Sequence, residues 1–61
     1  MCNLFKVLKA TKPELGRMIP AGGLVTVLGA DEKAYLVYDM TNRCEVQVKR
    51  MKFDEHTVRC C

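Results

Sequence analysis

Short apolar segments separated by polar turns limit this chain to a fold built mostly of β-strands. The segments are LVTVLG at 24–29, AYLVYDM at 34–40 and CEVQVKR at 44–50. β-branched and aromatic residues fill them, and the sequences between them, GADEK and TNR, are typical of turns. Three such segments in succession predict an antiparallel meander, in which neighbours along the chain lie side by side.

The pattern inside each segment predicts which strand lies where. Cys44, Val46 and Val48 alternate with polar residues, so we expect one dry and one wet face there, with Cys44 as a small buried hydrophobe. The segment at 24–29 is apolar on both faces and is expected to be a central strand. Phe53 and one tyrosine are expected in the core, and the methionines are expected to fill gaps in it.

The two ends of the chain have weaker patterns. Residues 3–11, NLFKVLKAT, fit either one helical face or a strand, and the β-rich remainder favours the strand. Prolines and glycines interrupt residues 11–20, but a capping box from Thr11 to Glu14 allows one short helical turn near residues 12–18. Residues 54–61 leave two alternatives open, a flexible tail or a final short strand at Val58.

The spacing of GGLVTVL, AYLVYD and CEVQVKRMKF resembles that of the SH3-like barrel over about residues 22–53. The resemblance implies that the meander closes into a small barrel, with the terminal segments adding strands. It implies no function, because this superfold carries many unrelated ones. The 61 residues allow a single domain, 1–61, with so thin a core that a homodimer is a reasonable expectation.

Charge gives the first indication of function. The chain has 10 Lys and Arg against 7 Asp and Glu, a net charge of +3. Three cations stand within KRMK at 49–52, where they have no evident structural role, and more stand in KVLKATK at 6–12. Basic side chains beside aromatic rings suit nucleic acids. The predicted binding residues are Lys6, Lys9, Lys12, Tyr38, Arg43, Lys49, Arg50 and Lys52.

Two partners fit this basic surface, a nucleic acid or an acidic patch on a protein. The first predicts a regulator that binds nucleic acid through its backbone. The alternative is a protein-interaction module that docks on a larger protein and modulates it, like the small accessory regulators of phages and mobile elements. Phosphate contacts weaken steeply with salt and apolar docking does not, so salt dependence separates the two.

Catalytic motifs are not expected to contribute. His56 is the sole histidine and stands in a polar segment, so no catalytic residue and no cofactor are predicted. The cysteines are expected to be free thiols in a reducing cytoplasm. A weaker alternative is a zinc site from Cys44, His56, Cys60 and Cys61, although no C-x-x-C pair is present. No apolar run approaches the roughly 20 residues of a membrane-spanning helix, so we expect a soluble, cytoplasmic protein.

Overall fold

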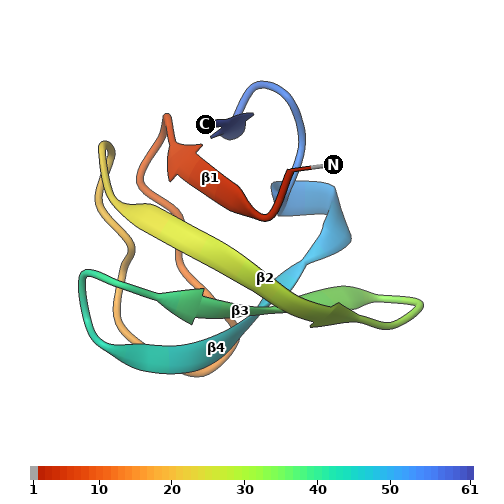
Figure 1. The fold of residues 1–61 in the computed structure, drawn as a ribbon. Helices are drawn as coiled ribbons and strands as arrows, with labels where there is room; N and C mark the ends of the chain where they lie inside the picture. Colours follow the sequence, from red (N-terminus) through yellow and green to blue (C-terminus); the bar gives the residue numbers. More distant parts are fainter. Residues whose placement is uncertain (1) are drawn as a thin grey trace.

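A computed structural model describes residues 2–61, which form one antiparallel sheet (Figure 1). Its strands lie in the order β4-β3-β2-β1-β5. Their bounds are β1 Leu4–Val7, β2 Leu24–Ala30, β3 Ala34–Asp39, β4 Cys44–Lys49 and β5 Val58–Cys60. The predicted mainly β fold and its meander, β2-β3-β4, are confirmed. The segment with two apolar faces is the central strand, as expected.

The first strand joins the meander to the end of the chain. Phe5 in β1 pairs with Val25 of β2 on one side and with Cys60 of β5 on the other. The strand alternative for the N-terminal segment is therefore confirmed over Leu4–Val7. The C-terminal alternative of a final short strand is confirmed as well, because Val58 opens β5.

The sheet does not close into a barrel, so that part of the fold prediction is wrong. β4 and β5 lie at opposite edges of the sheet and do not pair within the described residues 2–61. Between them the chain forms a 3-10 helix, η1 (Arg50–Lys52), and a turn. The loop after β1 meets the edge of β4, where the Glu14 N–H donates to the Gln47 carbonyl oxygen at 3.2 Å. That contact satisfies one carbonyl group on a strand edge that has no neighbouring strand.

The predicted helical turn near residues 12–18 is also wrong. Thr11 and Ile19 pair as an isolated antiparallel bridge, with N–H···O distances of 2.9 and 2.8 Å. The Thr11 hydroxyl donates to the Lys9 carbonyl oxygen, so it does not cap a helix. Pro13 is buried beside this bridge and lacks an N–H. The segment is thus held as a loop, and the helical turn of the described chain is η1 instead.

The core lies on the inner face of the sheet. Its buried residues are β-branched: Val7, Ile19, Val25, Val37, Val46, Val48 and Val58. Three half-buried rings pack against them, with centroid distances of 5.1 Å for Phe5–Phe53 and 4.8 Å for Tyr35–Phe53. The expectation that Phe53 and one tyrosine join the core is therefore met only in part. Rings placed at such distances attract each other beyond their burial.

The methionines do not fill gaps in the core, contrary to expectation. Met18, Met40 and Met51 are 50%, 41% and 75% exposed. The inner face is already occupied by compact valines that pack well on a pleated surface, which leaves no gap for a long side chain.

Two cysteine predictions are wrong. Cys44 opens β4 next to the turn, beyond the end of the core, so its thiol is exposed although the alternation places it on the inner side. Cys2 and Cys60 form a disulfide, with their Cα atoms 6.0 Å apart. The pairing of β1 with β5 brings the two chain ends together and so makes this bond geometrically feasible. Cys44 and Cys61 are free.

Candidate functional site

Three of the predicted binding residues line one shallow depression at the edge of β4. Lys12 comes from the loop after β1, Lys49 ends β4 and Lys52 ends η1, and Pro13 and Glu14 complete the lining. We call Lys12, Lys49 and Lys52 the lysine cluster. Segments almost forty residues apart meet here because Glu14 is hydrogen-bonded to Gln47 in the edge strand. With Glu14 counted, the lining carries three positive charges and one negative charge.

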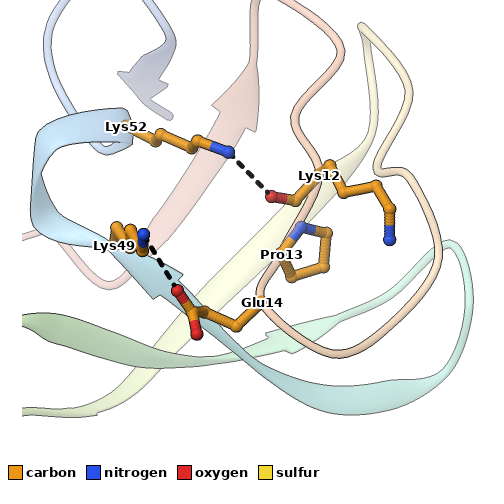
Figure 2. Close-up of a pocket in the computed structure, with 5 residues that line it drawn as sticks. All are labelled: Lys12, Pro13, Glu14, Lys49 and Lys52. Atoms are coloured by element: carbon orange, nitrogen blue, oxygen red, sulfur yellow. Dashed lines mark hydrogen bonds and ion pairs between the residues drawn. The ribbon is translucent and has the colours of Figure 1, made fainter.

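The lysine side chains make contacts at solvent-exposed positions (Figure 2). Lys49 Nζ lies 3.2 Å from Glu14 Oε1, and both side chains are about half exposed. Lys52 Nζ donates to the Lys12 carbonyl oxygen at 3.3 Å. The Lys12 side chain points away from Lys52, and its amine donates to the Gly16 carbonyl oxygen at 2.9 Å. Exposed pairs of this kind contribute little to stability, so a ligand can displace them cheaply.

Arg50 lies apart from the lysine cluster, although it follows Lys49 in sequence. Its guanidinium carbon lies 4.8 Å from the centre of the Tyr35 ring, and its Nε donates to the Asp31 carbonyl oxygen at 2.7 Å. A guanidinium over an aromatic ring is a favourable cation–π contact. Arg50 thus ties η1 to the β2–β3 turn. The cations at 49–52 were expected to lack a structural role, and these contacts give Arg50 one.

The remaining predicted binding residues do not join the lysine cluster. Lys6 lies on the outer face of β1 beside Arg59, three strand spacings from β4, or about 14 Å along the sheet. Tyr38 is half-buried on the same face and pairs with Glu45, whose charge disfavours a phosphate there. Arg43 occupies the β3–β4 turn with a φ of 57°, and Lys9 is exposed in the loop after β1.

A buried carboxylate organises the turn that carries Arg43. Asp39 is fully buried, and its Oδ1 accepts from the Thr41 N–H at 3.0 Å. Its Oδ2 accepts from the Asn42 side-chain amide at 2.6 Å. These bonds satisfy a group that would otherwise be costly to bury. Nothing in the sequence pattern distinguished Asp39 from a surface residue, because its role depends on the turn that follows it.

Two exposed aspartates have lowered pKa values because nearby groups donate to them. The backbone N–H groups of Lys33 and Ala34 hold the pKa of Asp31 below its usual 3.8. A hydrogen bond from the Thr57 side chain, with the N–H groups of His56 and Thr57, does the same for the pKa of Asp54. Both carboxylates stay charged at neutral pH. Asp31 lies in the β2–β3 turn beside Arg50, and Asp54 lies in the turn after η1.

The zinc alternative does not hold. Cys60 is oxidised in the disulfide, and residues 2–61 contain no group of three or more His, Cys, Asp or Glu placed to hold a metal ion. His56 lies 3.9 Å from Glu55, with both side chains largely exposed. No helix of the described chain has the length and apolar character to cross a membrane.

Comparisons with known protein families, with curated proteins and with solved structures find no match to this chain. The fold and the placement of its charged side chains are therefore the basis for a functional proposal.

Proposed function

We propose that this protein is a non-enzymatic regulatory binding protein that holds the phosphate backbone of a nucleic acid on the lysine cluster. The observation that carries the proposal is the meeting of Lys12, Lys49 and Lys52 around one depression. Lysine amines are point charges that suit phosphate oxygens in many orientations. The binding is accordingly expected to depend on backbone charge more than on base sequence.

The state of the lysine cluster supports this assignment. Each of its amines has one protein partner in the free chain, either a carbonyl oxygen or the carboxylate of Glu14. These partners are exposed, so exchanging them for phosphate oxygens costs little. Glu14 is the opposing element, because its carboxylate competes with a phosphate for Lys49. A phosphate that displaces Glu14 gains the same charge contact and releases condensed counterions from the nucleic acid.

The test compares two variants that lose the same charge. In the first, Lys12, Lys49 and Lys52 are replaced by Gln. In the control, Arg17, Lys33 and Arg59 are replaced by Gln, which also lowers the net charge from +3 to 0. The binding of a fluorescent 15-nucleotide single strand is measured by anisotropy at low salt. We expect the first variant to bind more than about tenfold more weakly, about 1.4 kcal/mol or more, and the control to lose about threefold or less.

Equal losses in both variants would contradict the proposal, because they would show that net charge and not the lysine cluster drives binding. Circular dichroism spectra of both variants check that the fold is retained. Each variant carries three surface substitutions, which are expected to leave the fold intact.

A second candidate function is docking on an acidic protein surface, which a different observation favours. A neighbouring depression shares Glu14 and Lys49 with the first and adds Met51, which is 75% exposed. Leu15, next to Glu14 in sequence, is 87% exposed. Apolar side chains beside cations suit a protein partner. Binding of such a partner, held in part by apolar contacts, would weaken less between 50 and 300 mM salt than binding of a nucleic acid.

A further inference from the structure

The largest side chains on the inner face of this domain are only partly buried. Phe5, Tyr35 and Phe53 are only half-buried, while the valines beside them are almost fully buried. A domain with so thin a core gains most by burying its rings completely, at about 25 cal/mol for each Å² of apolar surface. Partly exposed rings gathered in one place are therefore a feature that a ligand would explain.

The three rings lie in one open groove between β1, β3 and the turn after η1. Val27 of β2 completes its apolar floor, and the whole hollow measures about 540 Å³. This is ample for one or two extended side chains of a ligand. The disulfide between Cys2 and Cys60 forms part of the wall. We call this hollow the aromatic groove.

The charge of the aromatic groove is opposite to that of the lysine cluster. Asp54 and Glu55 stand at its rim, and none of its described lining residues is lysine or arginine. The hydrogen bonds to Asp54 keep that carboxylate ionised and fixed in place. The Glu55 side chain is 89% exposed and free to turn toward a ligand.

The molecule already contains one example of the contact that this groove offers. Arg50 places its guanidinium over Tyr35, the third ring of the set. A second cation would therefore meet Phe5 and Phe53, with its charge near Asp54 and Glu55. An aliphatic stem that ends in a cation matches an apolar floor with an acidic rim.

We propose that the aromatic groove binds a basic peptide segment, with a lysine side chain laid across Phe5 and Phe53 and its amine at Asp54 and Glu55. The site is distinct from the lysine cluster and takes a ligand of opposite charge. It goes beyond the proposed function, which would stand if this groove bound nothing.

The test uses three short peptides and amide chemical shifts of the full chain at 0.15 M salt, where charges beyond about 8 Å are screened. The peptides are nine residues long and differ at two central positions, which are both lysine, both norleucine or both glutamate. We expect the lysine peptide to shift the amides of Phe5, Tyr35 and residues 53–55. Norleucine keeps the stem and loses the charge, so its peptide should bind about threefold more weakly. The glutamate peptide should not bind.

Two variants of groove residues, with one control, test whether the peptide binds in the groove. Glu55→Gln removes a rim charge that has no role in the fold, and it should weaken the lysine peptide about threefold at low salt. Glu32→Gln makes the same change in the β2–β3 turn and should leave the affinity unchanged. Phe53→Leu keeps an apolar contact with the core and should weaken binding about fivefold. Should Phe53→Leu fail to fold, the two glutamate variants still decide the question.

Three outcomes would overturn the proposal. Equal affinity of the norleucine peptide would show an apolar groove with no preference for a cation. Shifts outside the groove would place the peptide elsewhere. Saturation of the groove amides by a free single-stranded oligonucleotide would assign the groove to a different class of ligand.

Discussion

The lysine cluster and the aromatic groove are built in different ways from the same small sheet. The first consists of exposed side chains that line one depression at the edge of β4 and contribute little to the fold. The second consists of rings that are packed against the core and against each other. Charge can therefore be removed from the cluster at little cost in stability, whereas the rings of the groove cannot be changed without cost to the core.

Arg50 marks the boundary between these regions. It stands between Lys49 and Lys52 in sequence, but its side chain contacts Tyr35 and the β2–β3 turn. Neighbouring cations on a short 3-10 turn point in different directions because the turn rotates about a third of a circle at each residue. A run of charge in a sequence is therefore not a patch of charge on a surface.

The largest expected effect concerns the disulfide, which lies in the wall of the groove and not in the lining of the lysine cluster. Cys2→Ser opens a link between residues 58 positions apart, and a loop of that length implies a loss of about 4 kcal/mol in the free energy of unfolding. Urea denaturation measures it. Cys61→Ser and Cys44→Ser, which remove free thiols, should leave the urea midpoint unchanged.

Counting reactive thiols tests the disulfide directly. The native protein should react at Cys44 and Cys61 only, and all four cysteines should react after reduction and unfolding. Four reactive thiols in the native state would contradict the disulfide that forms part of the groove wall. The same urea midpoint in the presence and in the absence of reductant would also contradict it.

A smaller effect is expected from Glu14, the one acid in the lining of the depression. Glu14→Gln removes the ion pair with Lys49 and one negative charge from the lining, so the affinity for a single strand should rise about threefold at low salt. Glu45→Gln makes the same change of charge on the outer face and should raise the affinity less. An affinity that falls in Glu14→Gln would mean that Glu14 holds the cluster in its binding shape.

The smallest expected effect is a loss of stability at acidic pH. The pKa values of Asp31 and Asp54 are lowered in the folded chain, so their contribution to stability is fully present above their unfolded value, near 3.8. It is lost as the pH falls through the lower folded values. Melting temperatures should therefore decline below about pH 4, and Asp54→Asn should flatten part of that decline. An unchanged profile in Asp54→Asn would contradict the lowered pKa of Asp54.

The sequence predicted the strands of the meander because their patterns are local. Val46 and Val48 alternate with polar residues and lie on the inner face, and the segment at 24–29 is the central strand. The predictions failed where contacts between residues far apart in the sequence determine the local structure. Thr11 pairs with Ile19 and so cannot cap a helix, and Cys60 meets Cys2 only because β5 pairs with β1. The prediction of free thiols assumed a reducing cytoplasm, and the disulfide contradicts it for Cys2 and Cys60.

The candidate sites were predictable to different degrees. Lys49 and Lys52 are visible as a charge run, but their meeting with Lys12 depends on the contact of Glu14 with Gln47. The aromatic groove has no signal in the sequence, because Phe5, Tyr35 and Phe53 belong to three separate segments. Only the register of the sheet and the turn after η1 bring these rings together.

The most direct test of the central claim is the salt dependence of binding to a single-stranded oligonucleotide. Affinities of the wild type and of the variant with Gln at positions 12, 49 and 52 are measured from 50 to 300 mM salt. Each phosphate contact contributes about 0.7 to the slope of log affinity against log salt, so the slope should be about 2 units shallower in the variant. Parallel slopes in the two proteins, or wild-type binding indifferent to salt, would contradict phosphate binding at the lysine cluster.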